Sequence, residues 1–129
     1  MKIVYPSTPV DAKGLLHSSI DDPNPVLFFE HKALYRGISG DVPDNNYHIE
    51  IGKGDIKHTG NDLTIVTYGF GVHWALDQVE KYLKNDIEIE VVDLRSLLPW
   101  DKDIVSESIK KTNRVLIIHE ATITGGIGA

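Results

Sequence analysis

The first thirty residues alternate between short apolar stretches and one amphipathic stretch, which predicts a strand, a helix and a second strand. Lys2–Tyr5 and Val26–Glu30 are short runs rich in β-branched and aromatic residues, which are typical of buried strands. Between them, Ser7-Thr8-Pro9 has the pattern of a helix start, a hydroxyl N-cap followed by proline at the first helical position. Pro23 and Pro25 then end the helix. Two strands joined in this way run parallel, with a right-handed connection.

Residues 31–60 lose this periodicity. Glycine, proline and asparagine interrupt them repeatedly. A stretch of this length without regular structure is unusual inside one compact domain. We interpret the segment as an interdomain linker that holds one short strand near Tyr47–Ile51.

Regular alternation returns in residues 61–129, where three apolar stretches are separated by two amphipathic ones. The first amphipathic stretch places Val72, Ala75 and Val79 on one helical face. Strands that alternate with helices indicate an α/β fold with a doubly wound parallel sheet. The second strand begins with strict alternation, which predicts one partly exposed end. The predicted strands are Leu63–Gly69, Ile87–Asp93 and Arg114–Glu120, and the predicted helices run from about Phe70 to Lys84 and from Pro99 to about Lys111.

Composition and charge exclude several classes of protein. A chain of 129 residues that is 41% hydrophobic and 25% charged has the size and balance of one globular domain. The net charge of −6 argues against a nucleic-acid-binding protein, which usually carries a basic patch. A chain without cysteine has no disulfides, no thiolate zinc site and no cysteine nucleophile. Because its apolar runs are far shorter than a membrane span and no signal-peptide core follows Met1, we expect a cytoplasmic location without membrane contact.

The sequence patterns at both ends of the chain predict that its sheets are incomplete. Thr124–Ala129 is a glycine-rich loop of the kind that leads into a helix, so the last predicted strand would lack the helix that covers it. At the other end, one strand–helix–strand unit is too small to complete a sheet of its own. We therefore expect the chain to be part of a larger protein.

A series of short motifs, in the same order along nearly the whole chain, resembles the β subunit of the E1 component of 2-oxo acid dehydrogenases. Two of them, Pro99-Trp100-Asp101 and His119-Glu120-Ala121, are most similar to the branched-chain enzyme, 3-methyl-2-oxobutanoate dehydrogenase. Pyruvate and acetoin relatives share much of the pattern, which leaves the substrate open. The other motifs are Pro6-Ser7-Thr8-Pro9, Ala12-Lys13-Gly14-Leu15-Leu16, Asp22–Pro25, Phe28-Phe29-Glu30, Leu34-Tyr35-Arg36, Val92-Asp93-Leu94-Arg95 and Thr124-Gly125-Gly126.

The resemblance implies a domain organisation. Residues 1–30 correspond to the last strand–helix–strand piece of the domain that binds the pyrimidine ring of thiamine diphosphate. Residues 31–60 correspond to a linker. Residues 61–129 correspond to an incomplete transketolase C-terminal-like domain.

The resemblance also implies an activity and partners. The intact enzyme decarboxylates a branched-chain 2-oxo acid with thiamine diphosphate and Mg²⁺, and transfers the acyl group to the lipoyl group of the E2 acyltransferase. An E1 α subunit, or α half, holds the diphosphate and the metal, and a second β subunit joins the assembly. In the family, the active-site glutamate and histidine precede the first residue of this chain. The resemblance therefore assigns no catalytic and no cofactor-binding residue here, and implies a segment that serves subunit assembly and is inactive alone.

Two hypotheses other than a part of an enzyme remain open. The segment can be a non-catalytic module that only holds subunits together or docks E2. It can also be a stand-alone ligand-binding protein that uses the edge from Tyr68 to His73, because α/β sheets bind ligands at the carboxyl ends of their strands.

The resemblance implies one ion site, a structural K⁺ that some family members bind at the end of the first helix. Ser19 would offer its backbone carbonyl, and Asp22 and Asn24 would add further oxygens. Hard cations prefer oxygen ligands, and a helix C-terminus presents free carbonyls. Asp and Asn beside prolines are also ordinary turn formers, so a turn without a cation is the alternative.

The histidines and glycine-rich stretches carry weaker signals. His73 lies in the first turns of a helix just after a predicted strand end, where α/β sheets bind ligands, but we expect it to pack at a subunit or domain surface. His119-Glu120 ends a predicted strand, where a histidine beside a carboxylate can act as a general base. Because adjacent strand residues point to opposite faces, we expect a structural or interface role for this pair. Gly69-Phe70-Gly71 and Gly125-Gly126-Ile127-Gly128 lack the remaining residues of phosphate-binding motifs and predict tight turns. Arg36 is a candidate partner for a carboxylate, with a solvated linker as the alternative. The remaining histidines, His17, His31, His48 and His58, show no metal-ligand spacing.

Overall fold

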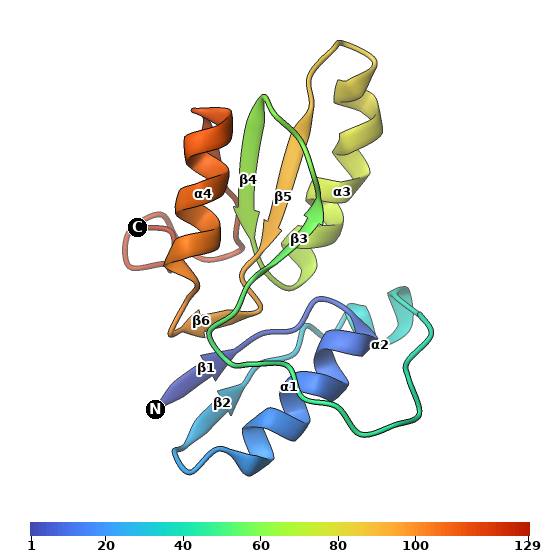
Figure 1. Ribbon diagram of the computed structural model, residues 1–129, viewed down its shortest axis with the longest axis vertical. Coiled ribbons are helices and arrows are strands. Elements are labelled where there is room, and N and C mark those ends of the chain that lie inside the picture. Colours follow the sequence, from blue (N-terminus) through green and yellow to red (C-terminus); the bar gives the residue numbers. More distant parts are fainter.

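The computed structural model describes residues 1–129 as two β-sheets, one above the other in Figure 1, with helices packed against them. The first sheet has the strand order β2-β1-β6, and the second has the order β3-β5-β4-β7. No helix is both long enough and apolar enough to span a bilayer. Along the chain the elements are β1 (Lys2–Val4), α1 (Pro9–Asp21), β2 (Val26–Phe28), α2 (Leu34–Gly37), β3 (Asp55–His58), β4 (Leu63–Thr67), α3 (Phe70–Leu83), β5 (Ile89–Asp93), β6 (Ser96–Leu98), α4 (Lys102–Thr112) and β7 (Val115–Ile117).

The predicted strand–helix–strand unit at the N-terminus is present. β1 and β2 run parallel, with Val4 opposite Phe28. α1 begins where the hydroxyl–proline pattern places it, because Thr8 is the N-cap and its side chain accepts a hydrogen bond from the Asp11 N–H. Val4 and Leu15 are fully buried where α1 packs over the strands. We refer to β1, α1 and β2 as the N-terminal unit.

A strand from the C-terminal half completes the first sheet. β6 runs antiparallel to β1, with Ile3 opposite Leu98, at a place where the sequence pattern predicts no strand. The pattern predicts a helix from Pro99, whereas α4 begins at Lys102 and has Asp101 as its N-cap. The pattern misses β6 because a strand of three residues is too short to show a period of its own. The two sheets are therefore joined by β-pairing as well as by the intervening segment.

The strand expected near Tyr47–Ile51 is not formed. This stretch lies along α1 instead, where the Ile49 N–H donates to the Gly14 carbonyl and the Tyr47 hydroxyl donates to the Val10 carbonyl. A Cβ on Gly14 would lie 2.6 Å from the Ile49 side chain. Alternating apolar residues pack here on a helix, which the pattern alone does not distinguish from pairing in a sheet. The regular structure between residues 31 and 60 is found in α2 and β3.

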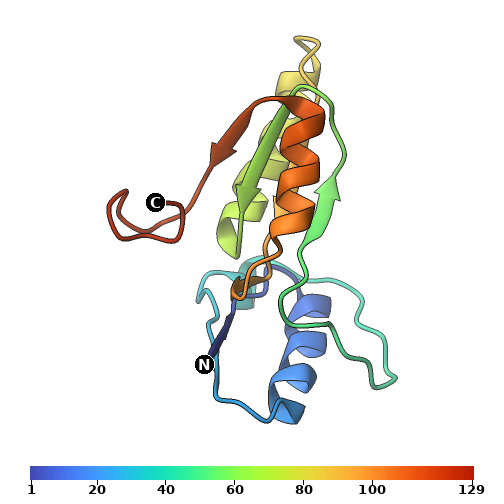
Figure 2. The ribbon, with the colours of Figure 1, turned by 60° about the vertical axis from the view of Figure 1, so that its left-hand side comes forward.

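The second sheet has the predicted α/β architecture, with one difference. β4 runs parallel to β5 and to β7, and α3 and α4 lie on opposite faces of the sheet (Figure 2). β3 adds an antiparallel edge strand, so the sheet is mixed and not wholly parallel. Alternate strand residues point to opposite faces. Ile65 and Val91 therefore pack with α3, whereas Val66 and Val92 pack with α4.

β5 is buried along its whole length, and the predicted partly exposed end lies just before it, where Ile87 is half-buried and Glu88 is exposed. The alternation fails at Glu90, which is buried. The Glu90 carboxylate accepts hydrogen bonds from the Ser108 hydroxyl and the Lys111 ammonium on α4. The hydroxyls of Ser108 and Thr112 each lie 2.7 Å from the Thr64 hydroxyl. Burial alone would raise the pKa of Glu90, but the bonds from Lys111 and Ser108 outweigh it and the pKa is lowered. Glu90 is therefore a buried, partnered charge.

β7 is an exposed edge of the second sheet and is shorter than the predicted strand over Arg114–Glu120. Its residues Val115, Leu116 and Ile117 are each about half exposed. Beyond β7 the chain turns away from the sheet and curls back on itself (Figure 2). Within this curl, Gly128 lies against the His119 ring, and a Cβ there would approach the ring to 2.6 Å.

Candidate functional site

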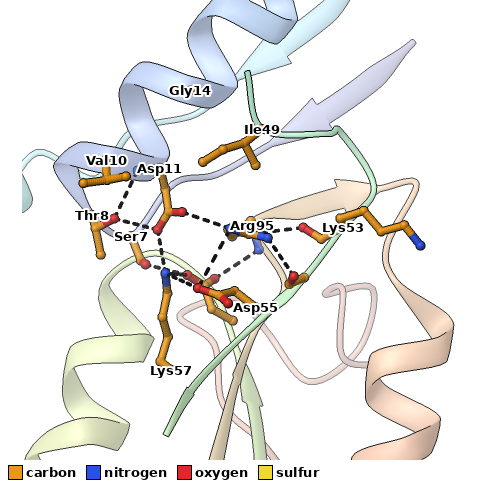
Figure 3. Close-up of polar contacts among 12 residues, drawn as sticks. Ser7, Thr8, Val10, Asp11, Gly14, Ile49, Lys53, Asp55, Lys57 and Arg95 are labelled. Atoms are coloured by element: carbon orange, nitrogen blue, oxygen red, sulfur yellow. Dashed lines mark hydrogen bonds and ion pairs between the residues drawn. The ribbon is translucent and has the colours of Figure 1, made fainter. Parts of the chain in front are cut away.

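A cluster of charged side chains lies where the two sheets meet (Figure 3). Asp11 comes from α1, Asp55 and Lys57 come from β3, Asp93 ends β5, and Arg95 lies in the turn between β5 and β6. We refer to these five residues as the junction network. Because Asp11 belongs to the N-terminal unit and the other four residues do not, the network joins the two parts of the chain.

Lys57 occupies the centre of the junction network. Its Nζ lies 2.8 Å from an oxygen of Asp11, 2.8 Å from an oxygen of Asp55 and 3.9 Å from an oxygen of Asp93. Burial would lower the pKa of Lys57, but the hydrogen bonds to Asp11 and Asp55 outweigh it and the pKa is raised. Lys57 therefore remains a cation that three carboxylates share.

Arg95 binds the network from the other side. Its backbone has a φ of 53°, a left-handed conformation that is unfavourable for a residue with a side chain. The guanidinium donates to Asp11 at 3.2 Å, to the Gly54 carbonyl at 2.7 Å and to the Lys53 carbonyl at 3.2 Å. These hydrogen bonds offset the backbone strain and tie α1 to the segment that leads into β3.

Asp11 has partners for both carboxylate oxygens. Oδ1 accepts from Arg95, and Oδ2 accepts from Lys57 and from the Thr8 hydroxyl. Burial would raise the pKa of Asp11, but the hydrogen bonds from Lys57 and Thr8 and the nearby charge of Arg95 outweigh it, so the pKa is lowered. Asp11 is therefore a buried ionised carboxylate whose partners lie in both parts of the chain.

Asp93 differs from Asp11 in the balance of these effects. It is 0% exposed, and desolvation raises its pKa to about 6 against the opposing effects of the Ser7 hydroxyl and the Lys57 charge. Oδ2 accepts from the Ser7 hydroxyl, and Oδ1 accepts from the Arg95 N–H at 3.0 Å. Asp93 therefore titrates nearer to neutral pH than an ordinary carboxyl.

His73 holds the same loop as Asp93. Its Nε2 lies 2.8 Å from the Ser7 carbonyl oxygen, to which it donates. Ser7 is therefore held twice, by Asp93 at its hydroxyl and by His73 at its carbonyl. This position gives His73 a structural contact between α3 and the loop that precedes α1.

The junction network does not fit a magnesium diphosphate. Mg²⁺ binds through free carboxylate oxygens, and a diphosphate needs free cations. Here the carboxylates of Asp11 and Asp55 are already paired with Lys57 and Arg95. No group of three or more His, Asp or Glu side chains is arranged to hold a metal ion. The network stabilises a contact between two parts of the chain, and we assign it no catalytic step.

The residues of the predicted K⁺ site lie together at the end of α1. Oδ1 of Asp22 accepts from the backbone and side-chain N–H groups of Asn24, and Oδ2 accepts from the Lys2 ammonium. These bonds, from Lys2 first and then Asn24, lower the pKa of Asp22 to about 2. The Ser19 hydroxyl donates to the Leu15 carbonyl. The turn is formed, and the K⁺ site at Ser19, Asp22 and Asn24 stays a prediction.

The carboxyl edge of the second sheet carries packed rings. His119 stacks on Tyr68 with ring centroids 6.4 Å apart. The neighbouring Glu120 pairs instead with His31, at 3.1 Å between Nε2 and Oε2, and the His31 ring stacks on Phe70. These adjacent residues therefore reach different partners, and they form no pair with each other.

Both glycine-rich stretches form turns. Gly69 has a φ of 55° at the turn from β4 into α3, and Gly125 has a φ of 80° in the C-terminal curl. A Cβ on Gly69 would lie 2.1 Å from the Tyr5 ring, so this turn also brings the two sheets into close contact.

A cavity of about 240 Å³ lies between the start of α1 and α2. Its lining is mainly apolar and includes Pro6, Pro9 and Leu34. On its rim the Tyr35 hydroxyl donates to the Glu30 carboxylate. The neighbouring Arg36 is exposed and forms no ion pair within the chain.

The junction network carries little local sequence signal. Lys57 and Asp55 lie in the segment whose pattern predicts a linker, and Asp11 stands out only as an acidic residue in the first turn of a helix. Asp93 and Arg95 belong to a motif of the family resemblance, but the motif names no partner for them. The bonds that connect the network span 46 residues from Lys57 to Asp11 and 84 residues from Arg95 to Asp11.

Residues 52–129 match the family model of the transketolase C-terminal domain. The chain belongs to the transketolase C-terminal domain family. The matched residues contain the whole second sheet, the helices α3 and α4, and the strand β6 that crosses to the first sheet.

The chain as a whole is similar to β subunits of two 2-oxo acid dehydrogenases. It is 50% identical, over 98% of its length, to the 2-oxoisovalerate dehydrogenase subunit beta of Bacillus subtilis. It is 48% identical, over 100% of its length, to the pyruvate dehydrogenase E1 component subunit beta of the same organism. The mitochondrial 2-oxoisovalerate dehydrogenase subunit beta 2 of Arabidopsis thaliana is 47% identical, again over 100% of the chain. The chain covers 39%, 40% and 36% of these relatives, or about two fifths of their length.

Solved transketolase structures share the fold. A split-gene transketolase, described as an inactive β4 tetramer, matches with a TM-score of 0.81 and 26% identity. The match covers 99% of this chain and 41% of the transketolase chain. A transketolase from Pichia stipitis matches with a TM-score of 0.63 and 17% identity, and this match covers 96% of this chain and 19% of the Pichia chain. Both matches include the N-terminal unit, so the arrangement of the two sheets recurs along with the family domain.

Proposed function

We propose that this chain is a part of the E1 component of a thiamine-diphosphate-dependent 2-oxo acid dehydrogenase and that it serves subunit assembly. The observation that carries the proposal is the alignment of at least 98% of the chain, at 48% to 50% identity, with β subunits of two such dehydrogenases. The similarity extends beyond residues 52–129 to the N-terminal unit. A β subunit is therefore favoured over an isolated copy of the family domain.

In this proposal the intact enzyme oxidatively decarboxylates a 2-oxo acid and passes the acyl group to the lipoyl group of an E2 acyltransferase. Thiamine diphosphate, held with Mg²⁺ elsewhere in the assembly, supplies the carbanion stabilisation. The contribution of this chain is positional: the junction network fixes the N-terminal unit against the family domain. We assign no catalytic residue to the chain and propose that it is inactive alone.

A branched-chain 2-oxo acid is the favoured substrate. The motifs Pro99-Trp100-Asp101 and His119-Glu120-Ala121 resemble the branched-chain enzyme, and two of the similar relatives are 2-oxoisovalerate dehydrogenase subunits. A pyruvate-type enzyme is the alternative, because the pyruvate dehydrogenase subunit of Bacillus subtilis is nearly as similar.

The proposed partners are an E1 α subunit or α half, a second β subunit and the E2 acyltransferase. Contiguous exposed apolar surface is typical of protein interfaces. The chain has such residues on β7 and on the first sheet, and the split-gene transketolase with the same fold is itself a β4 tetramer. A module that only assembles subunits is the second candidate, since the clustered charges of this chain are used to join its two parts. The exposed residues are Val115, Leu116, Ile117, Leu27, Phe29 and Leu98.

We also propose, as a property of the intact protein, the K⁺ site at Ser19, Asp22 and Asn24. The position of these residues at the C-terminal end of α1, where helix carbonyls lack helical partners, supports it. The cytoplasmic location likewise stays a prediction.

The proposed inactivity of the isolated chain has a direct test. The purified chain is mixed with thiamine diphosphate, Mg²⁺ and 3-methyl-2-oxobutanoate, and reduction of an artificial electron-accepting dye is followed. We expect no 2-oxo acid-dependent reduction. Turnover by the chain without any added protein would contradict the assignment of the catalytic groups to other parts of the assembly.

A further inference from the structure

We propose that Asp93 is a proton-binding site at the junction, so that the contact between the Ser7 loop and the second sheet takes up a proton as the pH falls from 7 to 5. The proposal concerns the chain itself and does not depend on which 2-oxo acid the intact enzyme uses. Its basis is the number and placement of charges in the junction network.

The junction network holds more negative than positive charges. Asp11, Asp55 and Asp93 face two cations, Lys57 and Arg95, so one carboxylate is in excess. Asp55 and Asp93 are also direct neighbours in the antiparallel pairing of β3 and β5, where like charges repel. One bound proton balances the network.

Asp93 is the carboxyl that should take this proton. Lys57 lies 2.8 Å from Asp11 and Asp55 but 3.9 Å from Asp93, and Arg95 directs its guanidinium to Asp11. Asp55 is partly exposed and is therefore solvated as an anion, whereas Asp93 is fully buried. The excess charge consequently has its highest energy at Asp93.

The surroundings of Asp93 accept either protonation state. The charged groups that face it are Lys57 and Asp55 from β3, Asp11 from α1 and Arg95 from the following turn, while β4 offers the neutral Thr67. On α3, His73 reaches the same loop through the Ser7 carbonyl. An ionised Asp93 accepts from the Ser7 hydroxyl, and a neutral Asp93 donates to it, so protonation keeps the bond across the junction.

The sign of the effect follows from the direction of the shift. Burial raises the pKa of Asp93 in the folded chain to about 6, above its value in the unfolded chain. Between pH 4 and pH 6 the folded chain therefore binds more protons, and its stability falls as the pH rises through this window. Asp11 acts in the opposite sense, because its pKa in the folded chain is lowered. Its contribution to stability is present above the unfolded pKa and is lost as the pH falls through the folded pKa.

The test compares the pH dependence of unfolding for the wild-type chain and Asp93→Asn. Asparagine keeps the shape, accepts from the Arg95 N–H and donates to Ser7, but it binds no proton. From pH 4.5 to pH 7, we expect the unfolding equilibrium constant of the wild type to rise on the order of thirtyfold more than that of Asp93→Asn. Asp44→Asn, the same change at an exposed linker carboxyl, should keep the wild-type profile.

A second measurement needs no variant. The carboxyl ¹³C resonance of Asp93 in the folded chain should titrate with a midpoint between pH 5 and pH 7. Parallel stability profiles for the wild type and Asp93→Asn, or an Asp93 midpoint below pH 4.5, would each overturn the proposal.

Discussion

Arg95 Nη1 lies 3.2 Å from Asp11 Oδ1, and this contact joins a turn of the second sheet to the first turn of α1. Little of either side chain is exposed, so solvent screens the pair only weakly. Arg95 holds this position with a left-handed backbone and with further bonds to the Lys53 and Gly54 carbonyls. The contact between the two sheets therefore depends on a residue whose backbone conformation is unfavourable.

Removing Arg95 should destabilise the chain strongly. Arg95→Ala leaves the buried Asp11 with only Lys57 as a cation, and breaking such a buried pair costs about 3 kcal/mol. Urea unfolding at pH 7 measures this loss. A double-mutant cycle with Asp11→Ala should give a coupling free energy of about 1–3 kcal/mol. A coupling near zero would mean that the contact adds nothing to stability.

The backbone of Arg95 has its own test. Because φ is 53°, Arg95→Gly should be more stable than Arg95→Ala by about 1 kcal/mol, although glycine is the smaller residue. The same urea titrations compare the two variants. If Arg95→Ala proves the more stable one, the left-handed conformation is wrong.

Lys111→Met should destabilise the chain at neutral pH but much less in acid. The substitution leaves the buried Glu90 carboxylate without its cation, at a cost of about 1–2 kcal/mol once the solvent exposure of Lys111 is allowed for. Since the folded pKa of Glu90 is lowered, this stability is present above the unfolded pKa and is lost as the pH falls through the folded one. Chemical unfolding at pH 7 and at pH 3.5 gives the comparison. Lys110→Met, at an exposed neighbour, should change little at either pH.

Gly69→Ala should destabilise the chain on the order of 2 kcal/mol or more. Alanine would adopt a left-handed φ of 55° and would bring its Cβ to within 2.1 Å of the Tyr5 ring. Gly40→Ala is the control, because a Cβ there meets nothing within 4 Å. Thermal unfolding of the two variants should separate them clearly, and equal midpoints would contradict the close packing of the two sheets at Gly69.

Local patterns predicted the elements of this fold well where each element has its own period or cap. The Thr8 cap, the α3 face with Val72, Ala75 and Val79, and the parallel strands all follow from short-range rules. The same rules missed β6, whose pairing with β1 is decided by residues far away in the chain.

The candidate site was less predictable because it consists of long-range contacts. Glu90 sits in an alternating pattern that suggests exposure, and only Lys111 and Ser108 on a later helix make its burial favourable. Lys57 lies in an apparently irregular segment, yet it becomes the centre of the junction network once β3 pairs with β5. Charge placement of this kind becomes visible only when the sheets are assembled.

An exchange of segments tests the central proposal most directly. In the 2-oxoisovalerate dehydrogenase subunit beta of Bacillus subtilis, the 127 aligned residues are replaced by this chain, which is 50% identical to them. The chimaera is produced with its α partner, and co-purification and 3-methyl-2-oxobutanoate-dependent dye reduction are measured. We expect the chimaera to co-purify with the α partner and to be active, and the same chimaera with Arg95→Ala to lose both properties in part. A folded chimaera that neither binds the α partner nor supports turnover would contradict the assignment of this chain to a 2-oxo acid dehydrogenase β subunit.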